Sequence, residues 1–162
     1  MAIEIERKFL VRTDRLPPLP VGTRICQAYI PTLNRTTVRI RLSGSQAFIA
    51  LKGPSIGVSR SEFEYPIPLV DAQQMIDQFC SGGTIDKVRH EILHEGMLWE
   101  LDIFSGENSG LIVAEIELTD EAQAFALPDW VDCEVSADPR YSNYELMQNP
   151  YSRWVIETAA IE

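Results

Sequence analysis

Hydrophobic and polar positions alternate along much of this chain with the two-residue period of β-strands. In the first such run, residues 3–11, the charged side chains of Glu4, Glu6 and Lys8 fall on one face, because successive side chains of a strand point to opposite faces. Further alternating runs predict strands at residues 23–30, 36–42, 47–52, 59–67, 85–93, 97–104 and 111–118. The chain is therefore expected to be built mainly from strands.

A helical period is clearest at residues 70–80, where Met75, Ile76 and Phe79 are apolar among polar neighbours and two glycines follow. The segments that come after the last long strand have weaker patterns. They predict a short helix at residues 120–126, with Asp120 as its N-cap. They also predict a brief strand at 131–135, a helix at 141–147 and a helical tail at 150–162.

Most of the predicted strands carry two charges of the same sign, two residues apart on one face. These pairs are Glu4/Glu6, Arg39/Arg41, Glu62/Glu64, Lys87/Arg89, Glu100/Asp102 and Glu115/Glu117. A solvated sheet face would interleave the signs, because neighbouring like charges destabilise a sheet. The pattern favours a closed eight-stranded antiparallel β-barrel of the α+β class, with the charged face lining a lumen and helices flanking the barrel. The length suits a single domain over residues 1–162.

The amino-acid composition argues against some classes of binding partner. Asp and Glu number 24 against 14 Lys and Arg, for a net charge of −10, which argues against nonspecific nucleic-acid binding and against anionic membranes. The sequence has no long apolar leader, and Cys26, Cys80 and Cys133 lack metal-binding spacing. We therefore expect a cytoplasmic protein with free thiols, and structural roles for His90 and His94.

Charges that line a lumen carry a large desolvation cost unless they are paired or bound to ligand. The basic set suits a polyanion with several oxygens, which arginines grip through two hydrogen bonds at a time. The acidic set suits a hard divalent cation, and Mg²⁺ is usually bound through a few carboxylates together with substrate phosphates. Together the two sets predict a site for a metal ion and a phosphate chain.

The charged segments, in their order and spacing, resemble the CYTH group of the triphosphate tunnel metalloenzymes over nearly the whole chain. They are Glu4-x-Glu6-x-Lys8, Val38-Arg39-Ile40-Arg41, Leu51-Lys52-Gly53, Glu62-Phe63-Glu64-Tyr65, Lys87-Val88-Arg89, Trp99-Glu100-Leu101-Asp102, Glu115-Ile116-Glu117 and Asp138-Pro139-Arg140-Tyr141-Ser142-Asn143. In length the chain is most similar to the short bacterial members that hydrolyse inorganic tripolyphosphate. One departure is Tyr144, where a small polar residue is expected.

This resemblance implies a role for each charged position. The triphosphate would be held by the basic side chains Lys8, Arg39, Arg41, Lys52, Lys87 and Arg89. The metal, Mg²⁺ or Mn²⁺, would be ligated by Glu4, Glu6 and Glu117, with Asp102 and Glu115 as further candidates. Supporting carboxylates would be Glu62, Glu64 and Glu100, where the first two could hold a second metal, position water or orient the basic residues.

The resemblance also implies that Tyr29 works with Lys8, and we expect Lys87 to complete the catalytic group. The expected activity is metal-dependent hydrolysis of inorganic triphosphate by a monomer or homodimer, with water as nucleophile, activated by a metal or a tunnel carboxylate. Hydrolysis of a nucleoside or thiamine triphosphate and an adenylate cyclase are alternatives on the same scaffold. A noncatalytic polyphosphate-binding module is an alternative of another class, and the charged lumen disfavours a lipocalin-like barrel for apolar ligands.

Overall fold

The computed structural model describes residues 2–154 of the chain. The strands are β1 (Ile3–Val11), β2 (Thr23–Ile30), β3 (Thr37–Ser43), β4 (Gln46–Lys52), β5 (Ser59–Ile67), β6 (Ile85–His94), β7 (Met97–Phe104), β8 (Ile112–Glu117) and β9 (Val131–Glu134). The α-helices are α1 (Leu69–Phe79) and α2 (Asn143–Gln148). These elements agree with the predicted ranges apart from small shifts at their ends.

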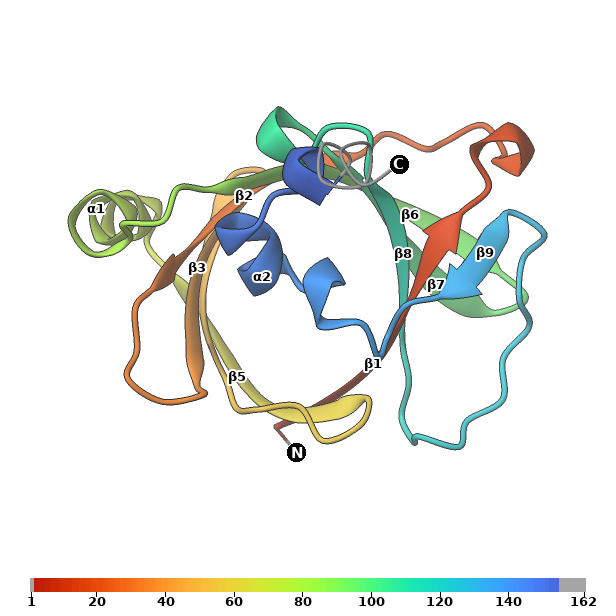
Figure 1. Cartoon of the computed structure of the whole chain (residues 1–162), viewed down its shortest axis with the longest axis horizontal. Helices are drawn as coiled ribbons and strands as arrows, with labels where there is room; N and C mark the ends of the chain where they lie inside the picture. The colour runs from red at the N-terminus through yellow and green to blue at the C-terminus, as the bar shows by residue number, and fades with distance from the viewer. Residues whose placement is uncertain (1, 155–162) are drawn as a thin grey trace.

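The strands form one antiparallel sheet in the order β5-β4-β3-β2-β6-β7-β8-β1-β9. Strand β5 also pairs with β1, where Glu4 lies opposite Arg60, so strands β1 to β8 close into a barrel. Strand β9 pairs with β1 beside this ring. Figure 1 looks into the barrel and shows α1 outside the ring and α2 within its outline. The predicted eight-stranded barrel with flanking helices is confirmed.

The apolar sides of the strands pack outside the ring. On one side, Ala72 of α1 covers Ile40 and Ala47. On the other side, Phe9 and Trp99 pack with Trp130, which lies just before β9. The amphipathic strands thus bury one face under flanking segments and leave the charged face to the lumen, as the alternating pattern requires.

A third apolar cluster lies inside the barrel. Ile85, Phe104 and Val113 follow the same alternation as the charged lumen residues and pack against Leu146 of α2 and Trp154. The charged rows of β6, β7 and β8 thus continue into apolar residues, and α2 with the segment behind it fills this part of the lumen. The predicted helix at residues 141–147 is confirmed in this way, shifted slightly toward the C-terminus.

The predicted helix at residues 120–126 is wrong. Asp120 accepts hydrogen bonds from the backbone of Ala122 at 2.8 Å, through its side chain, and of Gln123 at 3.0 Å, through its carbonyl. This is a turn, and such local bonding competes with helix formation. Within the predicted tail, Pro150 is not helical, residues 151–154 are helical, and residues 155–162 lie outside the described residues. Along residues 2–154, no helix is long and apolar enough to cross a membrane.

Candidate functional site

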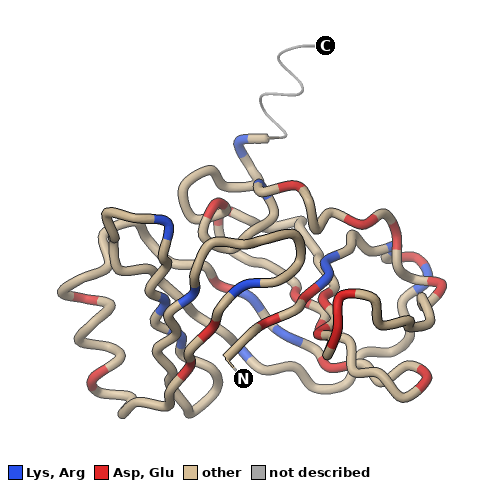
Figure 2. Tube along the Cα trace, turned by 90° about the horizontal axis from the view of Figure 1, so that it is seen from below, with Lys and Arg blue, Asp and Glu red and all other residues tan. Residues whose placement is uncertain are grey.

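The lumen side chains are positioned by strand register as well as by alternation. Cross-strand partners share a face, and β1 sets Glu6 opposite Glu117 and Lys8 opposite Glu115 of β8. In Figure 2 basic and acidic positions recur along the strands of the barrel. A cavity of about 350 Å³ lies among them. Its lining is Glu4, Glu6, Arg39, Arg41, Lys52, Glu62, Glu64, Arg89, Leu98, Glu100, Glu115, Glu117 and Asn143.

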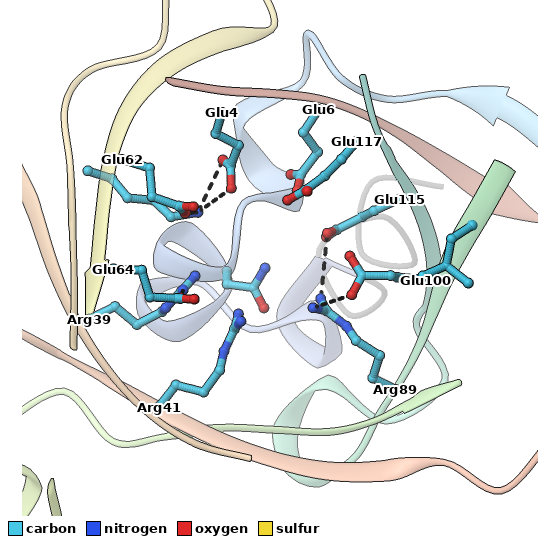
Figure 3. A pocket seen from close by; sticks show the side chains of 13 residues that line it. Glu4, Glu6, Arg39, Arg41, Glu62, Glu64, Arg89, Glu100, Glu115 and Glu117 are labelled. Atoms are coloured by element: carbon cyan, nitrogen blue, oxygen red, sulfur yellow. Dashed lines mark hydrogen bonds and ion pairs between the residues drawn. The ribbon is translucent and has the colours of Figure 1, made fainter. Parts of the chain in front are cut away.

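Three of the carboxylates converge on one wall of this cavity. Glu4, Glu6 and Glu117 each offer an oxygen, and these atoms all lie within 4.8 Å of one another. Figure 3 shows Glu6 and Glu117 side by side, with Glu4 next to them. Burial, followed by the charges of Glu115 and Glu4, raises the pKa of Glu6 well above its ordinary value. A cation at this point would relieve the repulsion, and three carboxylate oxygens suit a hard divalent ion.

The wall opposite this cluster carries guanidinium groups. Arg41 points into the lumen (Figure 3), and burial, together with the charges of Arg39 and Arg89, lowers its pKa to about 10. Arg39 donates from Nη2 to Glu64 at 2.8 Å, but its buried Nε has no hydrogen-bond partner. Buried donors without partners are rare and costly. An anion between these arginines would reduce the repulsion on Arg41.

Other lumen charges neutralise each other in pairs. Lys52 bridges Glu4 at 3.0 Å and Glu62 at 2.9 Å. Glu115 lies 3.5 Å from both Lys8 and Arg89. These contacts hold the pKa of Glu115 well below its ordinary value, although burial by itself would raise it. The lumen is therefore a network of ion pairs in which the wall with the acidic cluster faces the wall with the arginines, and Glu4 of that cluster is itself paired with Lys52.

Asp102 differs in its surroundings from the three clustered glutamates. It accepts hydrogen bonds from Lys87 at 2.7 Å and from two nitrogens of Arg89 at 2.8 and 2.9 Å. Arg89 also donates to Glu100 at 3.0 Å. Of the acids that the sequence offers as metal ligands, the structure brings Glu4, Glu6 and Glu117 together and places Asp102 and Glu115 among the cations.

A larger cavity of about 940 Å³ continues from Glu4 and Glu6 toward the C-terminal segment, and both Lys8 and Tyr29 line it. Within residues 2–154, no hydrogen bond joins these two side chains. The Lys8 ammonium donates to the carbonyl of Tyr141 at 3.2 Å, and the hydroxyl of Tyr29 accepts from Gln27 at 3.1 Å. The structure thus brings the two residues into one cavity, where each side chain hydrogen-bonds to a different partner.

Sequence reasoning assigned no role to three residues at this site, although it named Asn143 and Tyr144. Asn143 accepts a hydrogen bond from Lys87 at 3.0 Å, and Tyr144 packs edge-on against Tyr29 with ring centroids 5.3 Å apart. Gln27 is fully buried between Arg41 and Tyr29. Gln27 could have been identified as a lumen residue from the sequence, because it shares the lumen face of its predicted strand with Tyr29.

The CYTH domain family model matches residues 2–145. The chain belongs to the CYTH domain family, as the resemblance in its sequence indicates. Membership of this family of triphosphate tunnel enzymes implies a divalent metal ion, and the cluster of Glu4, Glu6 and Glu117 has the donor chemistry to accept one.

Within this family the chain is similar to inorganic triphosphatases. It is 42% identical to that of Acetivibrio thermocellus over 154 residues, which is 95% of this chain and 99% of the relative. It is 37% identical to that of Nitrosomonas europaea over 150 residues, covering 88% of this chain and 95% of the relative. A crystal structure of an inorganic triphosphatase superposes with a TM-score of 0.65 at 34% identity, covering 91% of this chain and 95% of that one.

Proposed function

We propose that this chain hydrolyses inorganic triphosphate in the lumen of its barrel, with Mg²⁺ or Mn²⁺ as cofactor. The observation that carries the proposal is the opposition of two groups within one cavity. Three clustered carboxylates, one of which (Glu4) is paired with Lys52, lie on one wall, and guanidiniums with an unsatisfied buried donor lie on the other. A triphosphate with a divalent cation complements both walls at once. The names of the two curated relatives point to the same reaction.

The lining of the smaller cavity favours an inorganic chain over an organic triphosphate. Leu98 is its single apolar lining residue, and every other residue there is charged apart from Asn143. A nucleobase or a thiamine ring would need apolar or stacking contacts to repay its desolvation. The cavity supplies such contacts poorly, whereas Arg39, Arg41, Lys52 and Arg89 offer cations to phosphate oxygens.

In this mechanism the protein holds the metal ion and the triphosphate and neutralises the negative charge of the phosphates. Glu4, Glu6 and Glu117 would hold the ion, which polarises phosphate oxygens when it is bound. Arg39 and Arg41 would grip equatorial and leaving oxygens, together with Lys8, Lys52 and Arg89, which line the two cavities. This stabilises the charge that spreads over the transferred phosphoryl group. Lys87, which the resemblance also assigns to the triphosphate, is fully buried against Asp102 and lines neither of these cavities. Water attacks the terminal phosphorus and gives up a proton to a tunnel carboxylate or to solvent. The phosphoanhydride bond breaks with its electron pair on the leaving oxygen, and phosphate and pyrophosphate leave.

The remaining lumen acids would hold the lysines and arginines in position. We propose that Asp102 and Glu115, offered by the sequence as further metal ligands, fix Lys87, Arg89 and Lys8 in place instead. Glu62, Glu64 and Glu100 would do the same for Lys52, Arg39 and Arg89, with which they pair at 2.9, 2.8 and 3.0 Å. This division supports pre-organised phosphate contacts, because each lysine or arginine has a fixed direction before substrate arrives.

A phosphate-release panel tests the proposal. Tripolyphosphate, ATP, thiamine triphosphate and pyrophosphate are each supplied with Mg²⁺ or Mn²⁺, and with a chelator as control. The expected result is rapid release from tripolyphosphate that stops after chelation. Release mainly from ATP or thiamine triphosphate would overturn the inorganic substrate. A melting-temperature shift with tripolyphosphate and no release under any divalent ion would establish a binding module instead.

A further inference from the structure

Gln27 is a fully buried polar residue in the wall of the lumen that no role in the proposed reaction yet explains. It lies on β2, directly opposite Arg41 of β3 in the antiparallel register. Its Oε1 accepts a hydrogen bond from Nε of Arg41 at 2.9 Å, and its Nε2 donates to the hydroxyl of Tyr29 at 3.1 Å. One amide therefore joins two side chains that face the substrate cavities.

The amide can have only one orientation in this bridge. An arginine guanidinium has donors and no acceptor, so the group that faces Arg41 must be the oxygen. The nitrogen must then face Tyr29 and donate to it. As a result, the phenolic oxygen uses a lone pair toward Gln27, and its hydrogen has to point elsewhere. Tyr29 lines the larger cavity, so a group bound there can receive this hydrogen.

We propose that Gln27 is a positioning residue that turns the Tyr29 hydroxyl into a hydrogen-bond donor toward the triphosphate. Arg41 fixes the orientation of this bridge. Its guanidinium can only donate, so it orients the amide of Gln27, and the amide in turn orients the hydroxyl of Tyr29. The inference rests on the proposed function. A buried amide with a purely structural role would need only hydrogen-bond partners for its own oxygen and nitrogen. Reversing the direction of the Tyr29 hydroxyl hydrogen would then leave the reaction unchanged, which distinguishes a structural role from a positioning role.

The substitution Gln27→Glu inverts that direction with little change in shape. Its carboxylate keeps the bond from Arg41 and stays ionised beside that cation. It has no hydrogen to donate, so Tyr29 must donate to it and loses its donor toward the lumen. The change also adds a negative charge to a lumen that binds an anion. The effect must therefore be separated from plain repulsion.

A double-mutant cycle with Tyr29→Phe makes this separation. We expect Gln27→Glu to lower kcat by about tenfold or more in the wild-type background, in the range of one lost transition-state hydrogen bond. In the Tyr29→Phe background the same change should cost less than about twofold in kcat, while repulsion raises KM in both backgrounds. Gln46→Glu, on the exposed start of β4, is the control for added charge and should leave kcat unchanged.

Equal losses of kcat in both backgrounds would overturn the proposal and leave Gln27 with a structural role. A Tyr29→Phe variant with wild-type kcat would overturn it as well. If Gln27→Glu does not fold, Gln27→Met is used in the same cycle, because it removes both bonds without adding charge. If the wild type releases no phosphate from tripolyphosphate, the proposed function fails by itself. The cycle is then measured on the Kd of tripolyphosphate by calorimetry, where the same coupling is expected.

Discussion

Asp102 and Lys87 form an ion pair of 2.7 Å in the barrel wall, with both side chains fully buried. Asp102 also receives two hydrogen bonds from Arg89, so one carboxylate balances two cations. Burial alone would raise the pKa of Asp102, but Lys87 and Arg89 hold it below its ordinary value. Burial lowers the pKa of Lys87 to about 8, and Asp102 opposes that shift. Removal of this carboxylate should therefore disturb both cations.

The first prediction concerns the stability of an Asp102→Asn variant. Breaking a buried pair by removing one partner leaves an uncompensated charge and costs about 3–5 kcal/mol. Urea unfolding at pH 7 should show a loss of this size. Asp132→Asn is the matched control, because Asp132 meets Arg12 at 3.7 Å with both side chains nearly half exposed. That change should stay within about 0.5 kcal/mol. Equal losses in the two variants would contradict the anchoring role of Asp102.

The second prediction concerns how that loss depends on pH. The pKa of Asp102 is lowered in the folded protein. A carboxylate of this kind stabilises the fold fully above its unfolded pKa and loses the contribution as the pH falls through its folded pKa. The gap in unfolding free energy between wild type and Asp102→Asn should therefore not shrink from pH 7 to 5, because loss of Asp102 lowers the pKa of Lys87 further, and it should shrink below the ordinary Asp value of 3.8. If the gap already shrinks between pH 7 and 6, the loss of stability depends on the titration of a group other than Asp102.

The third prediction concerns Arg41 as a phosphate contact. Arg41→Ala should lower kcat/KM for tripolyphosphate by about 10² to 10³, as expected for one lost transition-state contact. The fold should survive, because burial and the charges of Arg39 and Arg89 already disfavour the protonated form of Arg41. Arg24→Ala is the control, because Arg24 lies on β2 with its side chain exposed. An unchanged kcat/KM in a folded Arg41→Ala variant would remove Arg41 from the site.

Much of the fold follows from local patterns in the sequence. The period of two assigns Glu4, Glu6 and Lys8 to one face without any knowledge of neighbouring strands. Which acid meets which cation depends instead on cross-strand register, which sets Lys8 opposite Glu115 and Arg89 opposite Asp102. The alternating pattern therefore predicts a charged lumen but does not by itself separate the clustered acids from the other acids. The resemblance to the CYTH group names Glu4, Glu6 and Glu117 as the metal ligands, and these are the acids that cluster.

The C-terminal segment was harder to predict for a different reason. Its residues enter the lumen through contacts far apart in the chain, such as Asn143 with Lys87 and Tyr144 with Tyr29. Asp120 was predicted to cap a helix, but it forms a turn whose side-chain bond closes locally. Aspartate is favoured both at helix N-caps and in turns, so its residue type does not distinguish the two, and the surrounding packing decides between them.

The fourth prediction concerns Tyr144, which replaces the small polar residue expected at that position. Its ring meets Tyr29 edge-on at an interplanar angle of 90°, and such pairs contribute about 0.5–1.5 kcal/mol beyond their burial. Tyr144→Ala should therefore lower the unfolding free energy by at least about 1 kcal/mol. Tyr144→Phe keeps the ring and should retain stability in the same denaturation experiment. Equal losses in both variants would place the contribution in the hydroxyl group instead of the ring pair.

The last prediction concerns Glu6, whose carboxylate lies in the acidic cluster with Glu4 and Glu117. Glu6→Gln keeps the shape and removes one charge, so the metal concentration for half-maximal activity should rise and turnover should fall by orders of magnitude. The melting temperature should hold or increase, because burial and neighbouring acids already raise the pKa of Glu6. Tripolyphosphate should still bind the arginines in calorimetry. Glu107→Gln, exposed and outside both cavities, should change none of these. Normal turnover of Glu6→Gln at every Mg²⁺ and Mn²⁺ concentration would show that this strand does not hold the metal.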